Sequence, residues 1–212
     1  MQVAISIAPT KSNLLSASVS LEFSTKGFEL LDKKRNVLIR EMMGLIGRAK
    51  DIQERIDVTF NEAYEALKVA NITEGISKVQ EIAEAVDEMD DYDVLLRSVM
   101  GVEVPTLKFQ KKELEPSYSF YNTNNAFDIA LIRFQEVKYL IYELAEVENS
   151  VYRLATEIKK TQKRTNALQN IQIPKFKEIV KYIQDVLEEK EREDFFRLKM
   201  VKKKSVKKDE NM

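Results

Sequence analysis

The sequence predicts an all-α dominated fold: a long antiparallel two-helix coiled coil with a small middle segment containing a short helix and a β-hairpin. Two arrays of apolar residues, spaced alternately by three and four positions, lead to this prediction, one early and one late in the chain. Such a seven-residue repeat keeps one side of an α-helix facing a partner helix. Because both arrays belong to one chain, a hairpin of helices is the simplest arrangement, and a parallel dimer is the alternative.

The first array predicts a coiled-coil helix over residues 10–70. Only Ser24, Arg35 and Thr59 interrupt the apolar repeat. A helix of this length belongs to an elongated molecule rather than to a compact globule. The residues of the repeat are Leu14, Ala17, Leu21, Phe28, Leu31, Leu38, Met42, Leu45, Ala49, Ile52, Ile56, Ala63, Ala66 and Ala70.

The start of this helix and its glycines are also open to interpretation. A hydroxyl group of Thr10 or Ser12 could accept a hydrogen bond from the free amides of the first turn, so either residue is a candidate cap. Each glycine inside a helix costs about 1 kcal/mol relative to alanine. For Gly27, Gly44 and Gly47, a role in close packing and simple tolerance both stay open.

Residues 71–122 are predicted to form a small middle domain. We expect Thr73 to cap a short amphipathic helix with apolar positions at Ile76, Val79, Ile82, Ala83 and Val86. The segment from Val94 to Phe109 is rich in apolar and β-branched residues, and Gly101 divides it into two runs, which indicates a hairpin. Pro105 lacks an amide donor and belongs at an edge. An isolated hairpin is marginally stable, so this one should pack on the short helix or on the long helices.

An acidic run separates the short helix from the hairpin, with carboxylates at Asp87, Glu88, Asp90, Asp91 and Asp93. A calcium loop that begins at Asp87 would place Tyr92 where glycine is needed and Ser98 where a glutamate should bind the ion. We therefore interpret the run as a solvated turn. No metal or other cofactor is predicted for the chain.

Aromatic residues gather around the start of the second long helix, at Tyr118, Phe120, Tyr121, Phe127, Phe134, Tyr139 and Tyr142. They could form a partner-binding surface. Packing of the middle segment on the long helices is the simpler interpretation, because most large aromatic side chains in proteins serve packing.

The second array predicts a long helix over residues 123–203, capped by Thr123 or Asn124 and broken near 171–174. Pro174 marks that interruption, where the apolar phase slips. Beyond Leu187, charged residues of both signs run from Glu188 to Asp194, which is typical of a solvated helix. The array itself consists of Leu140, Leu144, Val147, Val151, Leu154, Ile158, Thr161, Thr165 and Leu168.

Residues 204–212 are predicted to be a disordered basic tail. The cations in the tail and in the residues just before it are Arg197, Lys199, Lys202, Lys203, Lys204, Lys207 and Lys208. Such a cluster can bind nucleic acid or an anionic membrane. Because no aromatic residue follows Phe196 and residues 1–196 are net acidic, we favour a frayed terminus or a contact with protein, and predict no nucleic-acid partner.

Composition excludes several kinds of chemistry. The chain has no cysteine and no histidine, so disulfides, the common zinc sites and catalysis by imidazole or thiolate are absent. A carboxylate-bridged metal enzyme would need Glu-x-x-His pairs. No phosphate-binding loop follows Gly44 or Gly47. No apolar stretch reaches about 18 residues, so we expect a cytoplasmic protein with no direct membrane insertion.

Three blocks of sequence resemble the D subunit of rotary vacuolar-type ATPases and of the related archaeal and bacterial ATP synthases. The first is Pro9-Thr10-Lys11 with the stretch from Gly27 to Arg35, GFELLDKKR; the second is RTNAL, residues 164–168, with Ile173-Pro174. The third is LEEKERE, residues 187–193, followed by FRLK, residues 196–199. The family usually has arginines before the asparagine and glutamate after the leucine, where this chain has Gln162, Lys163 and Gln169.

The resemblance implies a central-stalk protein without catalytic activity, peripheral to the membrane as part of its complex. It implies three partners: the catalytic hexamer of A and B subunits, the small companion F subunit of the stalk, and the membrane-ring adaptor, which is the C subunit (d-type). Motif positions then become candidate interface residues, namely Thr10, Lys11, Gly27, Leu31, Lys33, Lys34, Arg35, Arg164, Asn166, Leu168, Pro174, Glu188, Glu191, Arg192, Phe196 and Lys199.

Heptads alone would also suit a coiled-coil tether or an export-type chaperone unrelated to any ATPase. These proteins would have the same helices and the same apolar repeat. A stable complex with catalytic ATPase subunits distinguishes the stalk from both.

Overall fold

The computed structural model describes residues 7–84, 92–110, 118 and 123–209, with the backbone alone for 204–209. The chain divides into two compact units. The terminal unit comprises Met1–Arg35 and Lys160–Met212, and the middle unit comprises Asn36–Lys159. Each unit contains a pair of antiparallel helices, as the sequence predicted.

Helix α1, Lys11–Glu74, is the predicted first long helix. Of the two candidate caps, Thr10 makes the bond, because its Oγ1 accepts a hydrogen bond from the backbone N–H of Asn13 at 3.2 Å. The Asn13 side chain then donates to the carbonyl of Ala8 at 2.7 Å. The first bond satisfies an amide that a helix start leaves without an intrahelical partner, and the second holds the preceding residues against the first turn.

The predicted cap at Thr73 is wrong. Thr73 lies inside α1, and its hydroxyl donates back to the carbonyls of Val69 and Ala70. The helix ends instead before Gly75, which has φ +90°, a conformation that glycine adopts without the steric cost of a Cβ. Helix α2, Ile76–Glu84, begins directly after it and buries Val79.

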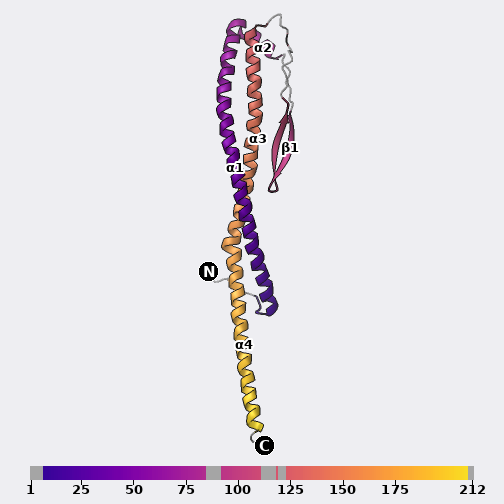
Figure 1. Ribbon diagram of the computed structural model, residues 1–212, viewed down its shortest axis with the longest axis vertical. Coiled ribbons are helices and arrows are strands. Elements are labelled where there is room, and N and C mark those ends of the chain that lie inside the picture. Colours follow the sequence, from indigo (N-terminus) through magenta and orange to yellow (C-terminus); the bar gives the residue numbers. More distant parts are fainter. Residues whose placement is uncertain (1–6, 85–91, 111–117, 119–122, 210–212) are drawn as a thin grey trace. The chain divides into compact units, whose positions relative to one another are not determined.

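In the middle unit, α1 pairs with α3, Asn125–Ala167, in the antiparallel sense. Leu38 of α1 packs with Leu154 of α3, and Ala70 of α1 packs with Phe127 of α3. Residue numbers therefore rise along α1 as they fall along α3, which is the antiparallel arrangement. The two helices lie side by side over this length (Figure 1). Asn124 directly precedes α3, and its carbonyl accepts from the amide of Phe127 at 2.9 Å.

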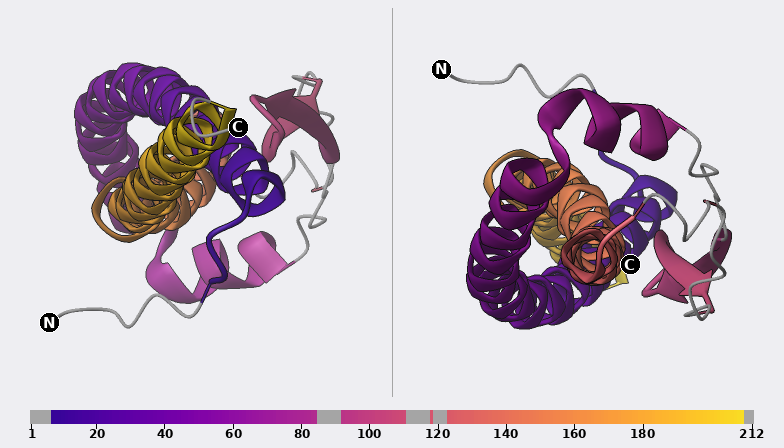
Figure 2. Two further views of the ribbon diagram at one scale, coloured as in Figure 1. Left: turned by 90° about the horizontal axis from the view of Figure 1, so that it is seen from below. Right: turned by 90° about the horizontal axis from the view of Figure 1, so that it is seen from above.

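The predicted hairpin consists of β1, Tyr92–Val99, and β2, Val102–Phe109. They pair antiparallel from Tyr92 opposite Phe109 to Val99 opposite Val102. Met100 and Gly101 form the two-residue turn with φ values of +51° and +77°, which suits the right-handed twist of the strands. Seen along the helices, the hairpin and α2 lie outside the α1–α3 pair (Figure 2).

The hairpin packs on the long helices rather than on α2. Val102 and Val104 of β2 are buried in one cluster with Leu38 of α1 and Leu154 of α3. Burial of one apolar face against helices provides the support that a two-stranded sheet needs. The middle unit is therefore three layers deep at this level.

Most of the described aromatic residues serve packing, as expected. Phe134 of α3 lies against Phe60 of α1, with ring centroids 6.4 Å apart. Phe109 of β2 stacks on Tyr139 of α3 at 5.6 Å. Further ring contacts join Tyr64 to Phe134, Tyr92 to Tyr142, and Phe109 to Tyr142.

Tyr118 contacts two residues in the first turn of α3. Its ring packs edge-on against buried Phe127 with centroids 5.0 Å apart, and its hydroxyl donates to Asp128 at 2.6 Å. Burial, followed by this hydrogen bond and the charge of Asp128, raises the pKa of Tyr118 above its ordinary value.

In the terminal unit, α3 runs into a π-helical turn, η2, Leu168–Gln172, and then into α4, Ile173–Asp209. The Ile173 amide bonds to the carbonyl of Leu168, five residues back. The interruption expected at Pro174 thus takes the form of a wider helical turn, which accommodates a residue without an amide donor. The core of this unit consists of Ala17 of α1 with Ile179 and Ile183 of α4.

Some predictions fall outside the described residues. They concern Val86, the carboxylates of Asp87, Glu88, Asp90 and Asp91, the aromatics Phe120 and Tyr121, and the side chains of Lys204, Lys207 and Lys208. In the ranges that the structure does describe, no helix has the length and hydropathy needed to cross a membrane.

Candidate functional site

All the candidate residues taken from the sequence belong to the terminal unit. Within it they occupy four places: the start of α1, a polar layer between α1 and the end of α3, the junction near η2, and the exposed length of α4. No single pocket among the described residues unites them. The terminal unit therefore offers an extended protein surface rather than an enclosed site.

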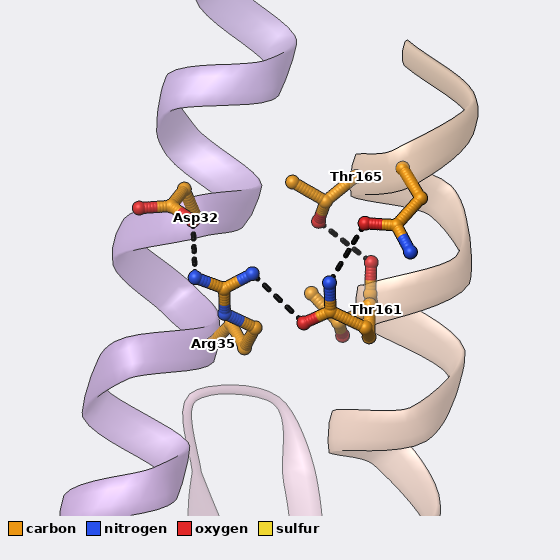
Figure 3. Close-up of polar contacts among 6 residues, drawn as sticks. Asp32, Arg35, Thr161 and Thr165 are labelled. Atoms are coloured by element: carbon orange, nitrogen blue, oxygen red, sulfur yellow. Dashed lines mark hydrogen bonds and ion pairs between the residues drawn. The ribbon is translucent and has the colours of Figure 1, made fainter. Parts of the chain in front are cut away.

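The polar layer is centred on Arg35, which interrupts the apolar repeat of the sequence. Its guanidinium forms an ion pair with Asp32 at 2.6 Å on α1 and donates to Gln162 Oε1 at 2.8 Å on α3 (Figure 3). Gln162 in turn donates through Nε2 to Asn166 Oδ1 at 2.7 Å. One chain of polar contacts thus joins the two helices.

Two buried threonines complete this layer. Thr161 and Thr165 are almost fully buried, and the hydroxyl of Thr165 donates to the carbonyl of Thr161 at 2.7 Å (Figure 3). Ser24 is also buried and donates to Ser20 in the same way. Because the hydroxyls of Thr165 and Ser24 donate to carbonyls of their own helices, they can be buried in the seam with their donors paired.

Buried or half-buried polar side chains between paired helices restrict the register of the pair, since a shift by one turn separates donor from acceptor. The Arg35–Gln162 bond has this property. Sequence patterns carry no direct signal for Gln162, because its role depends on how α3 is registered against α1. Its place beside the RTNAL block, residues 164–168, is the one hint.

At the junction near η2, Gly27 faces Leu168. A Cβ built on Gly27 would lie 4.0 Å from Leu168 Cδ1, an ordinary van der Waals distance. Gly44 and Gly47 would meet nothing within 4 Å. Close packing therefore does not require glycine at any of these three positions.

The remaining motif residues of α1 and of the α3–η2 junction vary in exposure. Lys33, Arg164 and Pro174 are exposed, whereas Leu31 and Lys34 are half-buried. Exposed motif residues are available to a partner, whereas half-buried ones also contribute to the helix pair.

Near the start of α1, Lys11 forms an ion pair with Glu191 of α4 at 3.1 Å. Both side chains are largely exposed, so this pair adds little stability. It nevertheless agrees with the antiparallel arrangement, because Lys11, which precedes Ala17 on α1, meets Glu191, which follows Ile183 on α4.

Beyond Leu187 every described side chain of α4 is exposed. Arg192 contacts Glu188 and Glu189 at 3.7 and 3.6 Å, and Arg197 contacts Glu193 and Asp194 at 3.5 and 3.6 Å. These are short-range pairs on one helix, as predicted for a solvated stretch.

Apolar side chains interrupt that charged surface. Phe195 and Phe196 are 66% and 63% exposed, and Lys199 follows them on the exposed helix. Glu188, Glu191 and Arg192 line an open hollow together with the two rings. Large exposed aromatic side chains beside charges are typical of surfaces that contact another protein.

Sequence reasoning did not identify three polar residues of α3 in the middle unit, Glu146, Ser150 and Arg153. Each is hydrogen-bonded to the main chain of β2. Their spacing of four and three residues places them on one face of the helix, and this spacing was the available signal.

The sequence matches the model of the ATP synthase D-subunit family over residues 13–203. It is 47% identical to the V-type ATP synthase D subunit of Thermotoga neapolitana over 200 residues, which cover 94% of this chain and 98% of the relative. The A-type ATP synthase D subunits of Methanobrevibacter smithii and Pyrococcus furiosus are 41% and 37% identical, covering 96% and 93% of this chain and 89% and 94% of the relatives. The chain therefore belongs to the ATP synthase D-subunit family.

Proposed function

We propose that this chain is the central-stalk component, or rotor axle, of a rotary V/A-type ATPase or ATP synthase. It couples ATP hydrolysis or synthesis in the catalytic hexamer to rotation of the membrane ring and to ion transport. The chain is not itself a catalyst, and it works on the cytoplasmic side, peripheral to the membrane. The observation that carries the proposal is the antiparallel pairing of the two chain ends in the terminal unit, where Ala17 packs with Ile179 and Ile183.

A two-helix axle suits this work for a physical reason. Two helices inside a ring of threefold symmetry cannot contact three catalytic interfaces alike, so each angular position favours a different set of subunit conformations. Nucleotide binding energy is then coupled to rotation through the differential contacts of the axle. The polar layer of Arg35 and Gln162 supports this role, because it resists sliding of one helix along the other.

We assign the partner subunits from the surface that each unit exposes. We assign the hexamer of A and B subunits to the exposed length of α4, where mixed charges and Phe195 and Phe196 are available. Exposed charge pairs are individually weak, and many weak contacts allow a surface to turn. The companion F subunit and the membrane-ring adaptor, the C subunit (d-type), are assigned to the middle unit and its surroundings.

A truncation after Leu187 tests this assignment in the assembled complex. The side chains removed from the described part of α4 are exposed, so the truncated chain should retain its core and most of its helical circular dichroism per residue. We expect the hexamer to lose much of its coupled ATPase activity, measured against ion transport or rotation, while binding of the companion persists.

A second variant, Phe195→Ala with Phe196→Ala, keeps the full helix and removes only the two exposed rings. It should reduce coupling less than the truncation does. Unchanged coupling in the truncated complex together with lost companion binding would reverse the assignment of the two units. Failure of the full chain to form a stable complex with the hexamer would favour a tether or export-type chaperone instead.

A further inference from the structure

The two outer edges of the hairpin have different surroundings. The outer edge of β2 is covered by α3. The Leu107 amide donates to Glu146 at 2.7 Å, and Arg153 donates to the Glu103 carbonyl at 3.1 Å. Ser150 shares its hydroxyl proton between the Glu146 carbonyl of its own helix, at 2.7 Å, and the Pro105 carbonyl, at 3.3 Å. The main-chain groups of these alternate β2 residues therefore point away from β1.

In an antiparallel pair, residues directly opposite each other direct their main-chain groups alike, both toward the partner or both away from it. Val94, Leu96 and Ser98 of β1 stand opposite Leu107, Pro105 and Glu103. Their N–H and C=O groups consequently point outward, along the free edge of β1. Within the described parts of the chain, no hydrogen bond reaches these groups.

This edge is also apolar over its middle three residues, between the charged residues Asp93 and Arg97. Val94, Leu95 and Leu96 are 57%, 52% and 59% exposed. Proteins usually block a free edge with lysine, proline or a bulge, because such an edge recruits another strand. In β1 the sequence YDVLLRSV contains no lysine and no proline, and it pairs with β2 without a bulge.

We infer that this edge binds the same edge of a second copy of the chain, so that two hairpins join into one four-stranded antiparallel sheet. Charge complementarity selects this occupant. A two-fold axis at Leu95 brings Asp93 of each copy opposite Arg97 of the other, and these are the charged residues of β1. An interface of this kind is self-complementary, as two-fold symmetry requires.

The directions in which the main-chain N–H and C=O groups of β1 point agree with that register. With the axis at Leu95, Val94 stands opposite Leu96, and both direct their main-chain groups outward, so they form a hydrogen-bonded pair. Asp93 and Arg97 then occupy a non-hydrogen-bonded pair, in which opposite side chains approach most closely. A register shifted by one residue would break both the hydrogen bonds and the charge pairing.

One pair of strands buries less area than the roughly 1,200 Å² typical of stable specific interfaces. The dimer is therefore weak and depends on concentration. It is a property of the free chain in solution and stands apart from the proposed stalk function, so either can fail without the other.

Sedimentation velocity over a concentration series tests the inference with two charge-reversal variants. Arg97→Glu leaves each copy with two acidic residues on β1, and Asp93→Lys leaves two basic ones. We expect the wild-type chain to dimerise and each variant alone to need a concentration higher by roughly tenfold or more, because two symmetric charge pairs become repulsive. An equimolar mixture of the two variants should dimerise again, since each acidic edge then meets a basic one.

Lys50→Glu is the matched control, because it makes the same kind of charge change at an exposed position of α1 outside the hairpin. It should dimerise as the wild type does, and circular dichroism should be the same for all four proteins. A wild-type chain that stays monomeric at the highest attainable concentration overturns the inference. Dimerisation that both variants retain, or that their mixture fails to restore, also overturns it.

Discussion

The terminal and middle units use the same helix pairing but stabilise it differently. In the terminal unit the described core is a narrow seam of Ala17, Ile179 and Ile183, continued by a polar layer. In the middle unit the hairpin adds a third layer, in which Val102 and Val104 cover Leu38 and Leu154. Ile183 and Leu154 are equally buried, at 0% and 1% exposed, but Ile183 lies between two helices only, whereas a third element covers Leu154. Paired substitutions can measure this difference.

The largest effect is expected from emptying the enclosed core. Leu154→Ala removes a side chain that is 1% exposed and packed among three elements, and should destabilise the protein by about 3–5 kcal/mol. Ile183→Ala in the terminal unit should cost less, about 2–3 kcal/mol, because a two-helix seam can close over the cavity. Urea denaturation followed by circular dichroism measures both. Equal losses would show that the third layer adds no rigidity.

The next largest loss of stability is expected from removing a hydrogen bond between β2 and α3. Glu146→Ala leaves the Leu107 amide without its carboxylate acceptor, which should cost about 1–2 kcal/mol and loosen the hairpin more than the helices. Hydrogen exchange of the Leu107 amide should accelerate. The control is Glu148→Ala on the exposed side of α3, where exchange of that amide should stay unchanged.

The polar layer of the terminal unit should show a coupling of about 1 kcal/mol. A double-mutant cycle with Arg35→Ala and Gln162→Ala isolates the bond between α1 and α3 from the intrahelical contacts of each residue. Additive losses in unfolding free energy would mean that this bond does not hold the register.

How much of this the sequence could predict depends on the range of the contact. The heptads and Gly101 report on local periodicity and a tight turn, and they yielded the long helices, the antiparallel pairing and the hairpin. Thr73 was misassigned because a threonine hydroxyl can cap a helix or bond back within one, and only the conformation of Gly75 decides between them. The Arg35–Gln162 bond and the cover of α3 over β2 depend on the register of distant segments, which no local pattern encodes.

Replacing a glycine inside α1 should raise the stability by a smaller amount than the substitutions above lower it. Gly27→Ala should stabilise the terminal unit by about 0.5–1 kcal/mol, because the added Cβ fits 4.0 Å from Leu168 and restricts the unfolded chain. Gly47→Ala in the middle unit should give the same gain, since its Cβ meets nothing within 4 Å. Thermal unfolding of both variants compares them. A loss at Gly27 beside a gain at Gly47 would mean that the terminal unit needs glycine for close approach.

The smallest effect is expected at the start of α1 in the terminal unit. Lys11 and Glu191 are 3.1 Å apart but largely exposed, so water and salt screen their attraction. Lys11→Gln should change the free energy of unfolding by less than about 0.5 kcal/mol, and this difference should vanish in roughly 0.5 M salt. A change above about 1 kcal/mol that persisted in salt would mean that the pair contributes to the core of the terminal unit. The difference proposed between a terminal unit of two helices and a middle unit covered by a third layer would then not hold at the start of α1.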